Sequence, residues 1–384
     1  MNSFRYGSRI LKETATLVRS GLARHVYIAG IHEEGLREHE EIDDGREIWR
    51  ARLRTRKWSR RLPVQLLKYL EFCIRTVRYA RGKKIGFVNI HSLPLLPLGA
   101  LLKLIYKAKL VYDAHELESE TYGLTGVRQV MARMVERIFI GHADLVIVVG
   151  GLINEWYRRK YGLSNIVTVL NCPEFQEPQR SQRFHRELGI PEKKKIVLYQ
   201  GGLVRGRGVE PLLEAFAGDD DGRHVLVLMG YGELVPLIRE YKQSHDNIFF
   251  KEAVEPHVLL EYTASADIGI AYIDNSSLND QYCLPNKLFE YTMAGLPIIV
   301  NNVPEMRRVV NENRIGVVLD DLNARSLARA LSEIGRMDSG CLMDNLRRAA
   351  ERYSWNHQAQ SMINAYHQYV FRGSRSACTS GIPS

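Results

Sequence analysis

The sequence has few of the features that mark membrane-spanning or exported chains. No stretch approaches the roughly 18 consecutive apolar residues that a membrane-spanning helix needs. The longest apolar runs, 93–102 and 145–153, are shorter than that and are interrupted by proline or glycine. The N-terminus also lacks the apolar core of a signal peptide, so export is not expected. These absences favour a cytoplasmic protein.

Cysteine is scarce and follows no recognisable pattern. The five cysteines are odd in number and never stand at the short spacings of zinc ligands: Cys73, Cys172, Cys283, Cys341 and Cys378. A disulfide framework needs paired cysteines and an oxidising compartment. We therefore expect neither a disulfide-stapled fold nor a structural metal site.

What the chain does contain is a repeated alternation of strand-like and helix-like segments. The first series of candidate strands comprises 25–31, 85–90, 109–113, 145–149 and 168–171, and the second comprises 195–200, 224–229, 247–250, 267–272, 297–301 and 315–319. Helical patterns lie between them, for example 9–20, 64–79, 129–140, 211–216, 259–264 and 324–334. Such alternation predicts parallel sheets covered by helices on both faces. With 384 residues, the chain is long enough for two such α/β domains.

The two series are separated by 173–186, a polar stretch with two prolines that we interpret as a linker. A final amphipathic helix, 355–370, could reach back across this linker, and residues from 373 onward have the composition of a flexible tail. The start is unusual, because a doubly wound domain normally opens with a strand. Here only 1–7 precede the first helical pattern, so the first strand is missing or lies upstream.

The segment 284–297 carries the most chemical information. Pro285 suits the first turn of a helix that begins at Asn286 and leads into a buried strand. Its free N–H groups would form a site for a diphosphate, with Lys287 adding a positive charge in the first turn. Glu290, one turn further, could accept hydrogen bonds from ribose hydroxyls. The alternative is a surface glutamate on an amphipathic helix.

A glycine-rich loop, 201–208, follows the first strand of the second series. Gly201 and Gly202 would let the backbone approach an anion closely, while Arg205 and Arg207 can pair with phosphate oxygens. The loop is neither a Walker A motif nor a Gly-x-Gly-x-x-Gly fingerprint. By itself the loop is only moderate evidence for a phosphate site, because many α/β proteins have a glycine turn between strand and helix.

Further candidate residues follow other strands. Gly230 follows one strand, and Ala253 with Val254 follows another and could offer backbone groups to a nucleobase; a structural turn is the alternative for each. In the first half, His115 stands between Asp113 and Glu116 directly after a strand, where such residues favour a ligand-binding role. His91 ends the preceding strand in a similar way, with a structural role equally plausible.

The loop ending at Arg207, the segment 285–297 and the segment 113–116 occur in an order and spacing that resemble the retaining glycosyltransferases of family 4. The resemblance covers nearly the whole chain. It implies the GT-B fold, two Rossmann-like doubly wound domains facing across a cleft. It also implies transfer of a sugar from a nucleoside diphosphate, UDP- or GDP-linked, to an acceptor hydroxyl with retention of configuration, as in bacterial surface polysaccharide or glycolipid assembly.

By this resemblance, 1–175 form an acceptor-side domain, 187–354 bind the nucleotide sugar, 355–372 form a closing helix, and 373–384 form the tail. Arg207 would hold the donor diphosphate, Glu290 the ribose, and His115 would lie near the transferred sugar. The chain departs from the family at two positions. It has Gly202 where many members have a basic residue, a loss for which Arg205 could compensate. It also has Tyr282 where many have a glutamate that contacts the donor sugar, a contact that Asn279 or Asp280 could make instead.

The chemistry requires no metal or other cofactor, because Arg205, Arg207, Lys287 and the helix N-terminus can stabilise a leaving diphosphate. The proton of the acceptor could pass to the leaving phosphate, so that no separate base is needed. The run 219–221 spells the Asp-x-Asp of metal-dependent transferases, but it lies between a helix and a strand. We interpret it as a solvated turn.

The segment 50–84 holds thirteen lysines or arginines and one acid, Glu71. Leucines and other apolar residues recur within it at helical spacing. A basic surface beside an amphipathic helix suits an anionic membrane, such as the inner face of the plasma membrane, and would place the enzyme beside a glycan or lipid-linked acceptor. The alternative is a helix packed on the sheet with a solvated basic face.

Two other functions fit parts of the sequence. A nucleotide-sugar epimerase of the same architecture would use the donor site without an acceptor. A nucleic-acid-binding protein could use 50–84, although that segment lacks a recognised nucleic-acid fold and stacking aromatics, so no nucleic-acid partner is expected.

Overall fold

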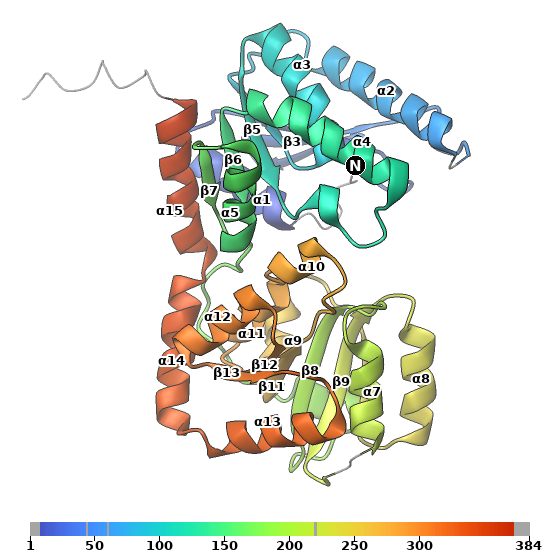
Figure 1. Ribbon diagram of the computed structural model, residues 1–384, viewed down its shortest axis with the longest axis vertical. Coiled ribbons are helices and arrows are strands. Elements are labelled where there is room, and N and C mark those ends of the chain that lie inside the picture. Colours follow the sequence, from blue (N-terminus) through green and yellow to red (C-terminus); the bar gives the residue numbers. More distant parts are fainter. Residues whose placement is uncertain (1–7, 44, 60, 219–220, 372–384) are drawn as a thin grey trace, which may run out of the picture.

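The computed structural model describes residues 8–43, 45–59, 61–218 and 221–371 and shows two α/β lobes joined by a waist (Figure 1). The two-domain α/β architecture predicted from the sequence is confirmed. Residues 1–7, the tail from 373 and two of the three aspartates of 219–221 lie outside the described residues. Across the part of the chain that is described, every helix is too short or too polar to span a bilayer.

The C-terminal lobe is built on one parallel sheet of six strands. The strands are β8 (Lys195–Gly202), β9 (His224–Tyr231), β10 (Ile248–Glu252), β11 (Ile268–Ala271), β12 (Ile298–Asn301) and β13 (Gly316–Leu319). Their order is β10-β9-β8-β11-β12-β13, so the direction of winding reverses between β8 and β11. In sheets of this type, ligands bind outside the carboxyl ends of the strands at the reversal.

Helices cover both faces of this sheet, as the continuous apolar strands require. In β8, Val197 and Tyr199 point toward one face, while Ile196 and Leu198 point toward the other. The first face is covered by α7 (Val209–Gly218), α8 (Val235–Ser244) and α13 (Ala324–Arg336). The second is covered by α6 (Arg183–Leu188), α9 (Leu259–Thr263), α11 (Asn286–Met293), α12 (Pro304–Asn313) and α14 (Ser339–Arg352).

The N-terminal lobe has two sheets within the described residues. A parallel sheet runs in the order β4 (Phe87–Ile90), β5 (Lys109–Ala114), β6 (Leu145–Val148) and β7 (Ile166–Thr168). A smaller sheet runs in the order β1 (Val26–Ile31), β3 (Arg46–Ala51) and β2 (His39–Asp43), with β2 antiparallel to β3. The hairpin β2–β3 was not predicted. The strand expected at 168–171 corresponds to β7, which begins and ends earlier in the chain. The first element described is a helix, α1 (Ser8–Arg19).

Helices of the N-terminal lobe again lie on both sides of the parallel sheet. One face packs against α3 (Leu96–Tyr106), α4 (Gly126–Phe139) and α5 (Gly151–Tyr161). The other face packs against α1 and against α15 (Trp355–Ala365), which continues into one π-helical turn, Tyr366–Val370. The smaller sheet contacts α2 (Leu62–Tyr79) and α3. After β7 the chain passes through 169–182 into α6 of the other lobe. The backbone N–H of Leu117, which follows β5, donates a hydrogen bond to the side chain of Asn279 in α10 (Leu278–Tyr282) of that lobe.

Candidate active site

The glycine-rich loop leaves β8 at the reversal point of the C-terminal sheet. Gly201, Gly206 and Gly208 have φ values of 116°, 78° and 74°, in the range that favours glycine. A Cβ atom on Gly208 would lie 2.5 Å from the Tyr272 ring, so the loop packs directly on the segment that follows β11. Gly230 at the end of β9 approaches the carbonyl of Gly201 in the same way, because a Cβ atom there would lie 1.9 Å from that oxygen.

The N-terminus of α11 points toward this loop. Pro285 stands at the N-cap, and the Lys287 ammonium in the first turn lies 3.6 Å from the centre of the Tyr199 ring. It also lies 3.8 Å from the position that a Cβ atom of Gly201 would occupy. Burial, together with the nearby charge of Arg207, lowers the pKa of Lys287 to about 7. The structure therefore brings Gly201, Arg207 and Lys287 together.

Arg207 is partly exposed, and its guanidinium lies 3.9 Å from the carboxylate of Asp280 in α10. Asp280 itself accepts hydrogen bonds from Ser276 and Ser277 and is buried. Arg205 is exposed, and its backbone N–H donates to Glu233. Arg207 and Lys287 repel each other, while Asp280 lies near the first and Glu290 near the second. Two cations beside one glycine loop can bind an anion.

Glu290 lies one turn beyond Lys287. Its carboxylate accepts a hydrogen bond of 2.5 Å from the side chain of Gln200, which in turn accepts one from Thr263. Burial raises the pKa of Glu290, an effect that the Gln200 hydrogen bond and the charges of Lys287 and Lys12 oppose. Glu290 is therefore not a solvated surface residue: it is held in a fixed orientation beside the cationic corner.

The remaining predicted C-terminal residues lie around the same strand ends. Gly202 is exposed at the end of β8, whereas Ala253 and Val254 follow the edge strand β10. Val254 packs on the core beneath α9 and α11, while Ala253 is exposed. Asn286 opens α11, and its side chain accepts a hydrogen bond from Asn171 of the other lobe.

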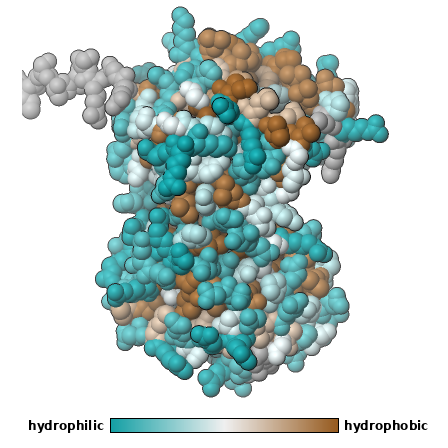
Figure 2. Space-filling view, in the orientation of Figure 1, coloured by the Kyte–Doolittle hydropathy of each residue, from teal (hydrophilic) through white to brown (hydrophobic). Residues whose placement is uncertain are grey.

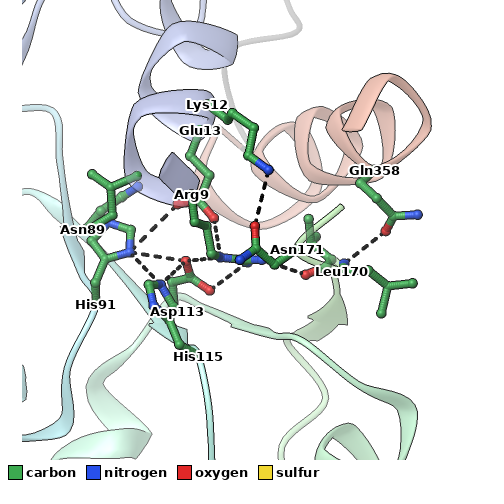
Figure 3. Close-up of polar contacts among 12 residues, drawn as sticks. Arg9, Lys12, Glu13, Asn89, His91, Asp113, His115, Leu170, Asn171 and Gln358 are labelled. Atoms are coloured by element: carbon green, nitrogen blue, oxygen red, sulfur yellow. Dashed lines mark hydrogen bonds and ion pairs between the residues drawn. The ribbon is translucent and has the colours of Figure 1, made fainter. Parts of the chain in front are cut away.

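A buried polar cluster lies on the N-terminal lobe, at the carboxyl ends of β4 and β5 (Figure 3). Asp113 is fully buried and accepts two hydrogen bonds from Arg9 of α1, at 3.1 and 2.9 Å. The ring nitrogens of His91 and His115 lie 3.1 and 3.0 Å from the same carboxylate and 3.2 Å from each other. Glu13 pairs with Arg9 at 2.8 Å.

The charges of this cluster nearly balance. Burial would raise the pKa of Asp113, but Arg9 and His115 hold it well below its usual range. Burial and the negative charge of Asp113 raise the pKa of Glu13 well above its usual range. Burial lowers the pKa of His91. The result is an ionised aspartate that fixes the ring of His115, whose side chain is one-third exposed at 33%.

Among the described residues, His91, Asp113 and His115 could offer ligand atoms to a metal ion, since these atoms lie within 4.8 Å of one another. The carboxylate of Asp113 is already occupied on both oxygens by Arg9. Its remaining contacts are with the two imidazoles. The cluster therefore fits the positioning of His115 better than the coordination of a cation.

Direct hydrogen bonds connect the lobes beside these clusters. The side-chain oxygen of Asn279 in α10 accepts from the backbone of Leu117, and its amide donates to Glu116. Both polar atoms of this buried asparagine are thus engaged between the lobes. On the other side, Lys12 donates to Asn171, which donates to Asn286. These contacts hold the two clusters at a defined separation.

Several site residues escaped the sequence interpretation. Arg9, Lys12 and Glu13 belong to α1, which the periodicity predicted only as a helical pattern. Gln200, the partner of Glu290, was read as the end of a strand. The sequence shows only that Arg9 and Glu13 stand one turn apart on the same helix; their burial, at 4% and 2% exposure, is set by the fold.

The family follows from comparison with known sequences. Residues 6–172 match the family model of the glycosyl transferase 4-like domain, and residues 180–353 match that of glycosyl transferases group 1. The chain therefore belongs to the group 1, family 4 glycosyltransferases of the GT-B type, as the motifs predicted.

Individual relatives are distant. The D-inositol 3-phosphate glycosyltransferase of Corynebacterium kroppenstedtii is 22% identical over 346 residues, which cover 83% of this chain and 75% of the relative. An uncharacterized glycosyltransferase of Methanocaldococcus jannaschii is matched over only 47% of its own length.

Solved structures share the fold at low identity. Sucrose-phosphate synthase from Thermosynechococcus elongatus has a TM-score of 0.78 with 18% identity, over 96% of this chain and 94% of that one. Anabaena Alr3699/HepE, solved in complex with UDP-glucose, has a TM-score of 0.70 with 14% identity, over 96% and 98%.

Proposed function

We propose that this glycosyltransferase transfers a sugar from a UDP- or GDP-sugar to an acceptor hydroxyl with retention of configuration, in surface polysaccharide or glycolipid assembly. The observation that carries the proposal is the convergence of Arg207, Lys287 and the N-terminus of α11 on the glycine loop. Oriented N–H groups and cations at this place suit a diphosphate. The complex of Alr3699/HepE with UDP-glucose supports a UDP-linked donor.

In the proposed reaction, the bond between the anomeric carbon and the diphosphate oxygen breaks, and its electron pair leaves with the diphosphate. The acceptor oxygen bonds to the same face of that carbon, and its proton passes to a departing phosphate oxygen. Arg207 and Lys287 stabilise the charge that develops on the diphosphate, with Arg205 close by. This mechanism needs no metal ion or other cofactor.

The other residues would hold the substrates. Glu290, oriented by Gln200, accepts hydrogen bonds from the ribose hydroxyls. Gly201, Gly202 and Gly230 let the backbone approach the phosphates, and the backbone of Ala253 and Val254 meets the base. His115, fixed by Asp113, faces the transferred sugar and, unlike the rest of the site, lies on the acceptor-side lobe.

We further propose a glycan or lipid-linked acceptor and a cytoplasmic enzyme that contacts the anionic inner face of the plasma membrane. The basic segment 50–84 supports this, and so does α2, whose apolar residues Leu66 and Leu70 are exposed rather than packed on the sheet. Exposed apolar side chains beside cations are typical of surfaces that bind membranes.

The test is a thermal-shift screen of nucleoside diphosphates and their sugars, followed by NMR of the product formed with candidate acceptors. We expect UDP, GDP or one of their sugars to raise the unfolding midpoint, because preferential binding to the folded state stabilises it. The product should keep the anomeric configuration of the donor, and EDTA should leave the rate unchanged. Turnover of a UDP-sugar without acceptor, or an inverted product, would contradict the proposal.

A further inference from the structure

Three neighbouring helices of the N-terminal lobe expose apolar side chains on their outer faces. The exposed residues include Leu66 and Leu70 of α2, Leu104 and Ile105 of α3, and Met134 and Ile138 of α4. Leu104 is 77% exposed. Scattered exposed leucines are normal on soluble proteins, but contiguous apolar patches mark interaction surfaces.

The helices are adjacent, so these residues form one surface. The side chain of Tyr106 in α3 bonds to the backbone of Val77 in α2, and Phe72 of α2 packs with Leu98 of α3. Helices α3 and α4 are also in contact. The space-filling view shows brown side chains gathered over this end of the upper lobe (Figure 2). We call this surface the three-helix face.

Helix α4 buries its carboxylate and exposes its apolar side chains. Its one carboxylate, Glu136, is fully buried and accepts hydrogen bonds from Ser119, Tyr157 and Tyr161. Its apolar residues Met134 and Ile138 meanwhile point outward. The carboxylate is thus satisfied inside the lobe, and the outer face of α4 is left apolar, as on surfaces that a partner covers.

The charge of the three-helix face is positive. Helices α2, α3 and α4 contain seven lysines or arginines and two acids, Glu71 and Glu136. Glu136 is buried, and Glu71 is tied to the backbone of Arg54 and Thr55 and to the side chain of Arg75. Cations and apolar groups therefore face outward while both carboxylates turn inward. An anionic and apolar partner is complementary to this surface.

A groove of about 660 Å³ lies at one end of the face, between α3 and the end of α4. Leu101, Leu104 and Phe139 line its walls, and Lys107 stands exposed at its rim. The other acid nearby, Asp144, is neutralised by Lys103 and Lys109. An apolar groove with a cation at its rim suits an acyl chain joined to a phosphate headgroup.

We propose that the three-helix face inserts into an anionic phospholipid leaflet, with one lipid acyl chain held in the α3–α4 groove and its phosphate at Lys107. This attachment is independent of the donor chemistry, so membrane binding and sugar transfer can fail separately. It goes beyond a salt-dependent contact of the basic segment, because the apolar residues of α3 and α4 enter the leaflet. Helix α4 begins near the waist (Figure 1), so the leaflet would lie beside the loop 121–125.

Co-sedimentation of the full chain with vesicles of phosphatidylcholine and phosphatidylglycerol tests the surface. The double variant Leu104→Glu/Met134→Glu should bind about tenfold more weakly or worse, because it removes two inserted side chains and adds negative charge. Lys107→Asn should weaken binding about fivefold; asparagine tolerates the left-handed backbone of Lys107, with φ 51°. The matched control is Met343→Glu, an exposed methionine on α14, which should bind like the wild type.

Native mass spectrometry with lyso-phosphatidylglycerol tests the groove, where we expect one retained lipid in the wild type and none in Lys107→Asn or the double variant. Unfolding midpoints identify any variant that fails to fold. If the double variant does not fold, Lys107→Asn alone tests the proposal. Vesicle binding that is absent in the wild type, or unchanged in folded variants, would overturn the proposal. So would a wild-type dimer that dissociates in the double variant without any vesicle binding, since the face would then join two copies of the chain.

Discussion

The two polar clusters at the waist differ in how closely their charges are paired. On the N-terminal lobe, Asp113 is surrounded by Arg9 and two histidines, and each charge has a partner within about hydrogen-bonding distance. On the C-terminal lobe, Lys287 and Arg207 lie close together, and Asp280 approaches Arg207 only to 3.9 Å. The first cluster is held by direct hydrogen-bonded ion pairs, whereas no carboxylate of the described residues lies within hydrogen-bonding distance of Lys287 or Arg207.

This difference separates two tasks. A self-neutralised cluster fixes the geometry of one exposed ring, His115, at little cost in repulsion. In the other cluster, burial and the charge of Arg207 lower the pKa of Lys287 and so disfavour its charged form, which a bound anion would favour. The C-terminal lobe is therefore the one expected to respond most strongly to a nucleotide. Four substitutions test this contrast.

The largest effect is expected from Asp113→Asn in the neutralised cluster. Removing this carboxylate leaves the buried Arg9 with less compensation, and breaking a buried pair typically costs about 3–5 kcal/mol of stability. Urea unfolding should show a loss of this size. The control Glu155→Gln breaks an exposed pair with Arg159 and should cost about 0.5 kcal/mol or less. Equal losses in both variants would mean that the cluster is not tightly coupled.

Arg207→Ala tests the cation-rich cluster. If Arg207 stabilises the departing diphosphate, turnover should fall about 100-fold to 1,000-fold, the size seen when one transition-state donor is removed. Initial rates with the donor identified by the screen give the measurement. Arg348→Ala, an exposed arginine on α14, should be unaffected. A rate near that of the wild type would remove Arg207 from the reaction.

The pH dependence of nucleotide binding probes Lys287. Its pKa of about 7 means that the free protein carries the charge below pH 7 and loses it above. A diphosphate favours the charged form, so affinity should fall by up to about tenfold per pH unit above 7. Calorimetry in buffers of different ionisation enthalpy should also detect proton uptake. Lys287→Arg stays charged and should show neither effect; a flat profile in the wild type would contradict the assignment.

Glu290→Gln should have the smallest effect. The amide keeps one acceptor for a ribose hydroxyl but loses the charge, so we expect affinity for the nucleoside diphosphate to fall about threefold to tenfold. Titration calorimetry with UDP or GDP measures it, and Glu214→Gln on α7 serves as a surface control. Unchanged affinity would show that Glu290 does not contact the nucleotide.

Much of the fold could be predicted because its strands are short apolar runs between helical patterns. All six strands of the C-terminal sheet were expected, with bounds shifted by a few residues at most. The hairpin β2–β3 was missed because β2 is fully exposed and consists mainly of charged residues, which hides the alternation of a strand. Asp44-Gly45, a dipeptide that favours tight hairpin turns, was the signal that could have revealed it.

The site was predicted unevenly for a physical reason. Residues that act through local geometry, such as Lys287 in the first turn of α11, leave a pattern in the nearby sequence. Arg9 meets Asp113 across 104 positions of the chain, and nothing in a single sequence reports such a distance. Glu290 was expected from its motif, but its partner Gln200, 90 positions away, was not.

The final helix has a consequence for how the chain is made. The core of the N-terminal lobe includes Trp355, Met362 and Tyr366, and the Trp355 indole bonds to Thr16. This lobe therefore cannot reach its finished packing on the ribosome until nearly the whole polypeptide has emerged, whereas the segment that forms the C-terminal sheet is complete earlier. For the same reason, an exchange of donor lobes between relatives must join the chains at two crossings, one near 173 and one near 354.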